Sequence, residues 1–578
     1  MIKTNRNQPC PCGSGKRFKH CCGALKQDTL QVKPDLAHLN LGDRLFAQNR
    51  FEEAIVSYQQ ALQLKPDLSA AHKSLGNIFR IQGKLEEAKA CFRKVLELNP
   101  NDGATQIKLA TLRPVIMGSH QDILDTRQQF QNNVNELLKQ ELKLTEPEKE
   151  TGVTNFYFAY HGFNDRDLQI QLAKLYEQAC PELLYTAPLV QRINERSIVT
   201  SFNGLNGLFQ DNNDNKHQSR KIKIGFVSKF FKNHTIGKVL CGLIANLSRE
   251  KFEVHVFFLP QKTDEIALFI QQNADHFETL PLVLDKARQH IAEKHLDILC
   301  YPDIGMDSFT YFLAFSRLAP VQCTTWGHPV TTGIRNLDYY ISTHDFEIEG
   351  AEEHYSEKLI RLNSQLTYYY RVTLPHFSKV RSDFGLADTD HIYLCPQALF
   401  KFHPDFDPIL ADILSQDAQG QVILVEGNHQ HWTELLKKRF SQTIPKAIND
   451  RIRFLPRMTL SDYFNLIALS EVMLDPFHFG GGNTTYEALP IGTPIVTLPT
   501  QFMRGRFTYA CYRQMGVMDC VAENPQHYVE IALKLGTQPD YREKIKARIL
   551  ATHTKLYEDI KVVHAFEQFF STAIHSEL

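Results

Sequence analysis

Residues 472–499 read VMLDPFHFGGGNTTYEALPIGTPIVTLP and carry the pattern on which the expected fold depends. A short apolar run is followed by three glycines, by a segment with helix-capping residues, and by a second apolar run. Gly480, Gly481 and Gly482 permit close approach of the backbone to a ligand. A helix that begins after a glycine-rich loop offers free N–H groups to an anion. The segment therefore predicts a phosphate site at the end of a strand.

The residues at the start of this helix suit the same chemistry. Asn483, Thr484 and Thr485 follow Gly482, can cap the helix and offer amide or hydroxyl groups. Glu487 lies less than a turn further on and could bind a ribose hydroxyl. A tight strand-to-helix turn without a ligand is the alternative. The apolar strand before the loop favours the phosphate interpretation.

The whole stretch from residue 221 onward alternates short apolar runs with helical segments. Near-continuous apolar strands separated by helices indicate parallel sheets covered on both faces. The runs divide into two sets, which predicts an α/β fold with two Rossmann-like domains, residues 221–380 and 381–578. The first set is KIKIGFVS (221–228), FEVHVFFLP (252–260), DILCYPDI (297–304), VQCTTWGHP (321–329) and LDYYIST (337–343), and the second is HIYLCPQ (391–397), QVILVEGN (421–428), RIRFLPR (451–457), VMLDPF (472–477) and PIVTLPT (494–500).

Polar residues follow other expected strands. Lys401, which shares the segment CPQALFKFHP with Gln397, could reach a diphosphate as a point charge, and an ordinary surface lysine is the alternative. His234, beside Asn233 in VSKFFKNHTIGKVL, lies between a strand and a helix. A lone histidine is usually structural, but one that faces a cleft is a candidate acid, base or binding group. The loop WGHPVTTG (326–333) is a third candidate, with a buried structural turn as the alternative.

The first 25 residues form a separate motif. Four thiolates with the spacing C-x-C-x8-C-C suit a tetrahedral Zn²⁺, although His20 could replace one of them. The segment CPCGSGKRFKHCCG also resembles the SEC-C zinc motif, which implies a structural zinc module over residues 1–25 that contacts other proteins. A reactive or disordered tail is the alternative. The expected zinc ligands are Cys10, Cys12, Cys21 and Cys22.

Residues 35–102 contain two copies of a 34-residue pattern. Small residues recur at Gly42 and Gly76, where they suit close helix packing. The pattern is typical of tetratricopeptide repeats, whose helix pairs stack into a solenoid. Two repeats rarely stand alone, so we expect a helical connector at residues 103–206 to continue the stack. The repeats could form a protein-binding groove or a scaffold for the rest of the chain.

Composition and charge exclude several classes of protein. The chain has 578 residues, of which 11% are aromatic, so we expect several folded domains rather than a disordered chain. With 64 Lys+Arg against 65 Asp+Glu, no general nucleic-acid binder is expected. There is no apolar signal region and no apolar run of about 18 residues, so we expect no secretion and no membrane insertion. Outside the first 25 residues the cysteines are scattered singly, which predicts a reducing, cytoplasmic location.

Four motifs together resemble the protein O-linked N-acetylglucosamine transferase family: KIGFVSKFFKNH, APVQCTTWGHPVTTG, CPQALFK and LDPFHFGGGNTTYEALPIGTPIVTLP. Members of that family join tetratricopeptide repeats to a GT-B glycosyltransferase of two Rossmann-like domains. The resemblance covers about residues 35–102 and 221–515. It implies transfer of a sugar, most simply N-acetylglucosamine from UDP-GlcNAc, to Ser or Thr hydroxyls of a protein acceptor that the repeats contact.

The resemblance also implies roles for single residues. His234 matches a histidine beside the reacting centre, and Lys401 matches a lysine that binds the donor diphosphate. Thr484 and Thr485 match a pair that caps the phosphates, and Glu487 matches an acidic residue that holds the ribose.

This chain departs from the family pattern in ways that bear on the donor and the acceptor. Animal members have His where Asn483 stands and Asp where Glu487 stands, and they have more repeats and no zinc motif. Plant relatives use a fucosyl donor and bacterial relatives transfer glucose, so these donors and a non-protein acceptor stay open. A non-catalytic adaptor is a further alternative, against which the joint presence of the site residues argues. An NAD-dependent enzyme is excluded because no G-x-G-x-x-G follows a first strand.

No catalytic metal is expected. A D-x-D motif that holds a cation on a diphosphate lies at the carboxyl end of a strand, whereas Asp388 and Asp390 precede the strand at 391–397. Asp405 and Asp407 follow Lys401 and are expected to start a helix. The predicted mechanism is therefore a single inverting displacement in which protein groups stabilise the leaving diphosphate.

Overall fold

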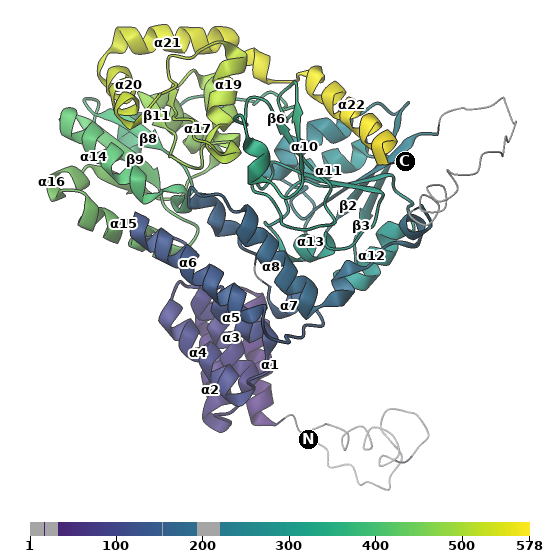
Figure 1. The fold of residues 1–578 in the computed structure, drawn as a ribbon. Coiled ribbons are helices and arrows are strands. Elements are labelled where there is room, and N and C mark those ends of the chain that lie inside the picture. The colour runs from purple at the N-terminus through teal and green to yellow at the C-terminus, as the bar shows by residue number, and fades with distance from the viewer. Residues whose placement is uncertain (1–16, 18–32, 153, 194–219, 578) are drawn as a thin grey trace, which may run out of the picture. The chain divides into compact units, whose positions relative to one another are not determined.

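The computed structural model describes Arg17 and residues 33–152, 154–193 and 220–577 (Figure 1). The expected zinc ligands Cys10, Cys12, Cys21 and Cys22 lie outside these described residues. The chain divides into two compact units, Met1–Thr105 and Gln106–Leu578. The first unit holds the repeats and the second holds two parallel sheets.

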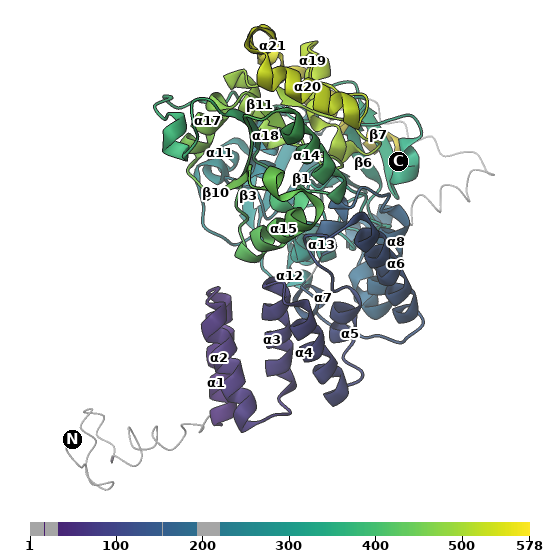
Figure 2. The same cartoon turned by 90° about the vertical axis from the view of Figure 1, so that its left-hand side faces the viewer.

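Two helices represent each repeat of the first unit, which confirms the predicted helix pairs. Consecutive helices contact one another and lie side by side in Figures 1 and 2. A Cβ atom at Gly42 would lie 2.5 Å from the ring of Tyr58, and one at Gly76 would lie 2.6 Å from the ring of Phe92. The recurring glycines therefore allow the same close helix-to-helix contact in both repeats. The helices are α1 (Pro34–Ala47), α2 (Phe51–Leu64), α3 (Ser69–Ile81) and α4 (Leu85–Leu98).

The first sheet of the second unit has seven strands in the order β3-β2-β1-β4-β5-β6-β7. Every neighbouring pair is parallel. The chain runs outward from β1 to β3, returns to β4 and then runs outward the other way, so the strand order reverses between β1 and β4. The strands are β1 (Ile222–Ser228), β2 (Phe252–Phe258), β3 (His276–Thr279), β4 (Ile298–Tyr301), β5 (Val321–Thr325), β6 (Tyr339–Thr343) and β7 (Lys358–Leu362).

The second sheet has five strands in the order β10-β9-β8-β11-β12, again with parallel neighbours. Its order reverses between β8 and β11. Two such sheets confirm the predicted GT-B architecture. The strands are β8 (His391–Cys395), β9 (Gly420–Val425), β10 (Ile452–Leu455), β11 (Val472–Leu474) and β12 (Ile495–Val496).

Parallel sheets bind ligands at the carboxyl ends of the strands where the order reverses. His234 follows β1, which borders the reversal in the first sheet. Lys401 follows β8 and the glycine-rich loop follows β11, the two strands that flank the reversal in the second sheet. The topology therefore explains why residues far apart in the sequence belong to one candidate site.

Each predicted strand segment contains a strand, and the sequence pattern misses only β3 and β7 among the described strands. Both lie at the edges of the first sheet. No residue of β3 is buried, and only Leu362 is buried in β7. An edge strand of this kind needs no continuous apolar run, so it lacks the signal that marks the central strands.

Helices fill most of the connections between strands, as the predicted alternation requires. In Figure 1 they lie around both sheets. They are α10 (Thr235–Asn246), α11 (Glu265–Asn273), α12 (Leu284–Ala292), α13 (Ser308–Leu313), α14 (Asp407–Gln416), α15 (Gln430–Thr443), α16 (Lys446–Asn449), α17 (Leu460–Leu469), α18 (Asn483–Ala488), α19 (Phe507–Met515), α20 (Pro525–Thr537) and α21 (Pro539–Thr552).

The last helix, α22 (Ile560–Glu577), returns to the first sheet, where it contacts α10 and β5. The chain therefore crosses between the two Rossmann-like halves twice. The two crossing segments lie side by side, because Tyr369 and Tyr557 form a parallel bridge. The N–H of Glu558 also donates to the carbonyl oxygen of Tyr369 at 2.9 Å.

The connector before the first sheet differs from the expected continuation of the repeat stack. From Gln106 onward the chain belongs to the same compact unit as the sheets. The ring of Tyr160 lies 4.7 Å from that of Phe400 and 4.5 Å from that of Phe479, so an aromatic segment of the connector packs on loops of the second half. The connector elements are α5 (Gly103–Ala110), α6 (His120–Leu137), α7 (Pro147–Glu150), the 3-10 helix η2 (Phe156–Tyr160), α8 (Arg166–Ala179) and the 3-10 helix η3 (Pro181–Leu184).

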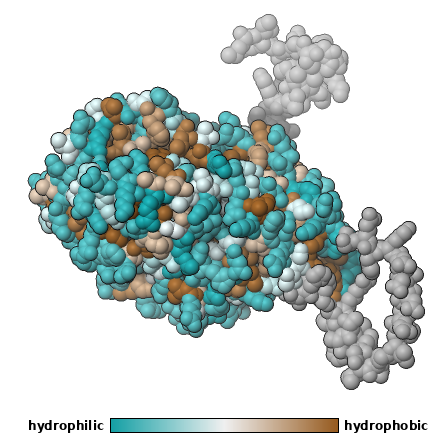
Figure 3. Space-filling view, turned by 90° about the horizontal axis from the view of Figure 1, so that it is seen from above, coloured by the Kyte–Doolittle hydropathy of each residue, from teal (hydrophilic) through white to brown (hydrophobic). Residues whose placement is uncertain are grey.

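Large apolar side chains of both sheets form the core of the fold. Phe226, Tyr340 and Tyr393 of the two sheets are fully buried. On the face drawn in Figure 3, hydrophobic residues form small groups among hydrophilic ones. Across the described part of the chain, no helix combines the length and the apolar character needed to cross a membrane.

The contact between Gly76 and Phe92 gives a test of the repeat packing. Gly76→Ala is expected to loosen the second repeat, because the new Cβ would lie 2.6 Å from the Phe92 ring and such overpacking costs about 1–3 kcal/mol. In a Phe92→Leu background the same change should be neutral or stabilising, since Ala favours a helix over Gly by about 1 kcal/mol. Hydrogen exchange of the α3 and α4 amides measures both effects. Equal changes in the two backgrounds would contradict the packing.

Candidate active site

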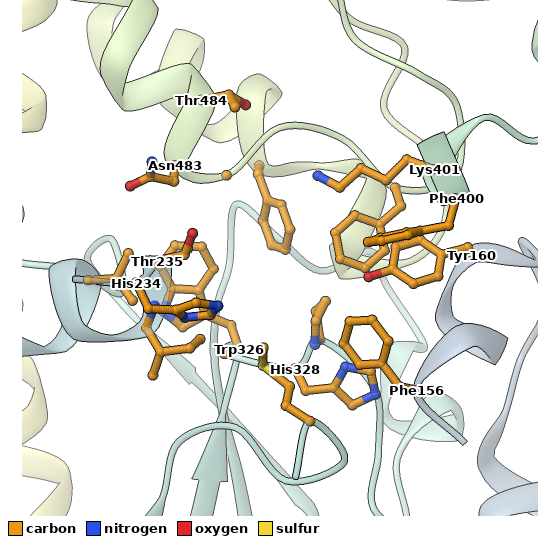
Figure 4. Close-up of a pocket in the computed structure, with 18 residues that line it drawn as sticks. Phe156, Tyr160, His234, Thr235, Trp326, His328, Phe400, Lys401, Asn483 and Thr484 are labelled. Atoms are coloured by element: carbon orange, nitrogen blue, oxygen red, sulfur yellow. The ribbon is translucent and has the colours of Figure 1, made fainter. Parts of the chain in front are cut away.

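A cavity of about 250 Å³ lies where the carboxyl ends of the two sheets face each other (Figure 4). Its polar lining includes predicted site residues from both halves: His234, Lys401, Gly482, Asn483 and Thr484. The rest of its wall is largely aromatic, with contributions from Phe156, Tyr160, Trp326, Phe400, Phe479 and Phe507.

A chain of hydrogen bonds links Lys401 to the glycine-rich loop. The ammonium group of Lys401 donates to Gln397 Oε1 at 2.8 Å and to the carbonyl oxygen of Gly480 at 2.9 Å. Gln397 Nε2 in turn donates to Thr484 Oγ1 at 2.7 Å. Gln397 therefore orients two of the groups that line the cavity.

Among the described residues, no carboxylate contacts the charge of Lys401 directly. Its nearest partners are neutral oxygens, and its Nζ lies 4.7 Å from the centre of the Phe479 ring. Burial lowers the pKa of Lys401 to about 8, although Asp475 acts in the opposite direction. A cation that is short of negative partners is suited to an anionic ligand.

Hydrogen bonds to the buried side chain of Asp475 hold the glycine-rich loop in place. The N–H of Gly481 donates to Asp475 Oδ1 at 2.6 Å, and the hydroxyl of Thr497 donates to Oδ2 at 2.9 Å. A Cβ atom at Gly480 would lie 2.7 Å from Asp475 Oδ2, so a side chain there would disturb this contact. The glycines are therefore required by the packing as well as by any ligand.

The two threonines of this loop have different surroundings. Thr484 lines the cavity, whereas the buried Thr485 donates to the carbonyl oxygen of Gly481 at 2.7 Å and lies 2.8 Å from the hydroxyl of Thr508. The structure therefore gives Thr485 a role in holding the loop rather than in lining the cavity. Beside them, Asn483 Oδ1 accepts a hydrogen bond of 2.6 Å from the hydroxyl of Tyr369.

Glu487 lies beside a neighbouring cavity of about 200 Å³ rather than in the one just described. Its Oε1 is 3.0 Å from the ammonium group of Lys238, so an ion pair joins α18 to α10. Tyr369 and Tyr370 line the same second cavity. Glu487 therefore does not line the cavity that holds Lys401. Asn483 and Thr484, which do line it, lie one turn earlier on the same helix.

His234 is fixed at the start of α10. Its Nδ1 accepts a 3.2 Å hydrogen bond from the N–H of Ile236, and its ring packs 4.6 Å from that of Phe230. Burial, reinforced by Lys232 and Lys238, lowers the pKa of His234 to about 4. The imidazole is therefore neutral near pH 7, with its proton on Nε2, because Nδ1 is the acceptor. Such a ring is a hydrogen-bond donor toward the cavity.

The sequence did not single out the aromatic segment that completes the cavity. Phe156 of η2 stacks on His328 with ring centres 5.0 Å apart. Burial lowers the pKa of His328 to about 3, and its Nδ1 has no hydrogen-bond partner within the described part of the chain. The loop WGHPVTTG is one of the loops that the sequence suggests for the site, and its residue His328 lines the cavity. The run FYFAY in an otherwise polar helical connector is the signal that could have found Phe156 and Tyr160.

Comparison with known families agrees with this geometry. Glycosyl transferase family 41 matches residues 205–379 and 376–563. Tetratricopeptide repeats match residues 42–79 and 69–102, and the SEC-C motif matches residues 6–24.

Similar proteins are known from plants and bacteria. A probable UDP-N-acetylglucosamine–peptide N-acetylglucosaminyltransferase SEC of Arabidopsis thaliana is 26% identical over 300 residues, which cover 50% of this chain and 30% of that protein. A UDP-glucose:protein N-beta-glucosyltransferase of Actinobacillus pleuropneumoniae is 25% identical over 257 residues, 44% of this chain and 40% of the relative. This chain therefore spans less than half the length of these relatives.

A solved structure shows the same fold. An O-GlcNAc transferase of Thermobaculum terrenum superposes with a TM-score of 0.68 at 20% identity, over 95% of this chain and 99% of that one.

The low pKa of Lys401 leads to a pH dependence of nucleotide binding. Lys401 carries its charge below pH 8 and loses it as the pH rises through about 8. Since a bound phosphate favours the charged form, affinity for a nucleotide sugar should be highest below pH 8 and fall above it by up to about tenfold per unit. Calorimetric titration from about pH 7 to 9.5 measures the slope. Lys401→Met should bind weakly at every pH, and a flat profile for the native protein would contradict this role.

Proposed function

The chain belongs to glycosyl transferase family 41 and is a glycosyltransferase, and we propose that it moves a sugar from a nucleoside diphosphate donor to hydroxyl groups of a protein acceptor. The proposed donor is UDP-N-acetylglucosamine, a choice supported by the name of the Arabidopsis relative. Glucose is the second candidate sugar, because the Actinobacillus relative is named as a UDP-glucose-dependent enzyme.

The observation that carries the proposal is that Lys401 and Thr484, which Gln397 holds in place, line one cavity together with His234. These groups lie at the reversal points of two parallel sheets. In the proposed complex the diphosphate lies against Lys401, Thr484 and the backbone at residues 482–485. The sugar then lies toward His234 and the aromatic wall. The nucleoside extends toward the second cavity, where Glu487 is the proposed ribose ligand beside Tyr369.

The proposed reaction is a single displacement that inverts the anomeric centre. The acceptor oxygen attacks the anomeric carbon as the bond to the diphosphate breaks, and the leaving phosphate takes the developing negative charge. Lys401 and Thr484 stabilise that charge. None of the described residues that line the cavity is an Asp or Glu. Asp475, which lies beneath the loop, already accepts from Gly481 and Thr497. This donor set supports a mechanism without a catalytic metal.

His234 is proposed to position a substrate rather than to remove the acceptor proton. A general base needs a free lone pair directed at the substrate. The Nδ1 lone pair of His234 is occupied by the N–H of Ile236, so the neutral ring presents Nε2–H to the cavity. Burial also holds its pKa at about 4, well below neutral pH. Donation of a hydrogen bond to the sugar or to the acceptor fits these properties.

The accessory parts of the chain supply the proposed partners. The repeats at residues 35–102 would add contact area for a polypeptide acceptor. The SEC-C motif would hold one structural Zn²⁺ through its four cysteines and contact another protein. A cytoplasmic location is proposed as well, since the eight cysteines of the described residues are all free thiols.

The activity can be tested with the full chain, a cell extract as a source of acceptors and a panel of UDP-GlcNAc, UDP-glucose and GDP-fucose. We expect transfer from UDP-GlcNAc with β-linked product and no increase in rate when Mg²⁺ or Mn²⁺ is added. Thr484→Ala should bind the donor more weakly, since a hydrogen bond to a charged group contributes about 1.5–3 kcal/mol. Strict dependence on Mg²⁺ or Mn²⁺, or an α-linked product, would overturn the mechanism. Transfer from another donor alone would replace the proposed sugar.

The role of His234 can be tested with matched substitutions. His234→Gln retains an N–H group near the position of Nε2 but cannot accept a proton. His234→Asn retains an acceptor near Nδ1 to cap α10 but lacks a group at Nε2. If the ring is a donor, Gln should retain much more activity than Asn or Ala, and Ala should lose about 10²–10⁴-fold while still binding nucleotide. Equal losses for Gln and Ala would support a base instead.

A further inference from the structure

An ion pair connects the two Rossmann-like halves at the wall of the second cavity. Lys238 belongs to α10 of the first half, and Glu487 belongs to α18 of the second half. The ammonium nitrogen of Lys238 lies 3.0 Å from Glu487 Oε1, and both side chains line the cavity of about 200 Å³. The proposed function gives a role to Glu487 and none to Lys238.

The two helices that carry this pair also contribute to the first cavity. His234 lies one turn before Lys238, whose N–H donates to the carbonyl oxygen of His234 at 3.0 Å. Asn483 and Thr484 lie about one turn before Glu487 on α18. Residues one turn apart lie on the same side of a helix. Each helix therefore contributes to both cavities, and the ion pair joins the two helices at the proposed nucleoside end.

The ion pair uses only part of the hydrogen-bonding capacity of Glu487. Among the described residues, the ammonium group of Lys238 is the one donor to this carboxylate, and it binds Oε1. An ionised carboxylate has two oxygens and about four acceptor positions. Oε2 therefore remains for a ligand hydroxyl, and Glu487 can keep its ion pair while it binds a ligand.

Stability alone is a weak explanation for this pair. The side chains of Lys238 and Glu487 are 25% and 7% exposed, so both charges lose much of their contact with water. The cost of that loss largely offsets the attraction between the two charges. Without Lys238, however, Glu487 would be a buried carboxylate without a partner, which costs far more. The lysine is therefore required if the glutamate is to stay charged in this wall.

We propose that Lys238 is a positioning residue for the nucleotide, which keeps Glu487 charged and holds its carboxylate so that Oε2 accepts from a ribose hydroxyl. This role rests on the proposed function, because it takes the second cavity as the site of the nucleoside. A hydrogen bond to a charged group is roughly twice as strong as one between neutral groups. Lys238 therefore increases the preference for a ribonucleotide over a deoxyribonucleotide through Glu487.

The test is the affinity of the full chain for UDP and for its 2′-deoxy and 3′-deoxy analogues, measured by calorimetry. The parent should bind UDP at least about tenfold more tightly than the analogue that lacks the bonded hydroxyl, because a hydrogen bond to a charged group contributes that much. Lys238→Met should reduce this ratio to about threefold, since a bond to a neutral carboxyl is about half as strong. Lys238→Arg, which retains the charge, should keep most of the ratio.

Two matched controls separate positioning from a general effect of charge or packing. Lys232→Met removes a positive charge that also acts on His234, but Lys232 lines neither cavity, so the ratio should not change. Glu487→Gln should lower the ratio by itself. In that background Lys238→Met should lower the ratio no further, because the two residues act through one interaction.

An unchanged ratio in Lys238→Met would overturn the positioning role and leave the ion pair as a tie between the two halves, while the proposed function would stand. A further fall of the ratio when Lys238→Met is added to Glu487→Gln would also overturn it, because the lysine would then act on the ribose without the glutamate. Equal binding of the three nucleotides by the parent, or no binding of UDP, would instead refute the proposed nucleoside site and the role of Lys238 with it.

Discussion

The buried carboxylate of Asp475 is the contact on which the candidate site depends. It follows β11 directly and accepts hydrogen bonds from Gly481 above it and from Thr497 beside it. Burial raises the pKa of Asp475, and the hydrogen bonds that it accepts oppose this effect. The loop can approach the carboxylate only because Gly480 has no side chain. With the loop in this position, its carbonyl oxygen at Gly480 and the hydroxyl of Thr484 meet the Lys401–Gln397 pair.

Most of the fold could be predicted from local sequence because the central strands are buried on both faces. Largely apolar runs, such as those within residues 252–260 and 421–428, are typical of strands of that kind. The edge strands β3 and β7 bury one residue between them, Leu362, so their sequences lack the apolar run that marks the central strands. The connector differs from the expectation in another way. Its helices form as the periodicity indicates, but periodicity does not tell which part of the chain a helix joins, and from Gln106 onward the connector belongs to the unit that contains the sheets.

The candidate site could be predicted where it depends on topology and not where it depends on side-chain direction. Residues after β1, β8 and β11 had to meet, and His234 and Lys401 do line one cavity. Thr485 points into the protein and Glu487 pairs with Lys238, because successive positions of a helix face different directions. The tautomer of His234 depends on a backbone N–H two residues further on, which is a property of the helix start that a motif does not record.

The two segments that cross between the halves are tied to each other. Two bodies joined by a single segment are held at one point, whereas here the bridge between Tyr369 and Tyr557 fixes the second crossing beside the first. The hydroxyl of the same Tyr369 donates a hydrogen bond to Asn483 in the wall of the cavity. The join between the two halves is therefore one hydrogen bond away from the loop that faces the ligand.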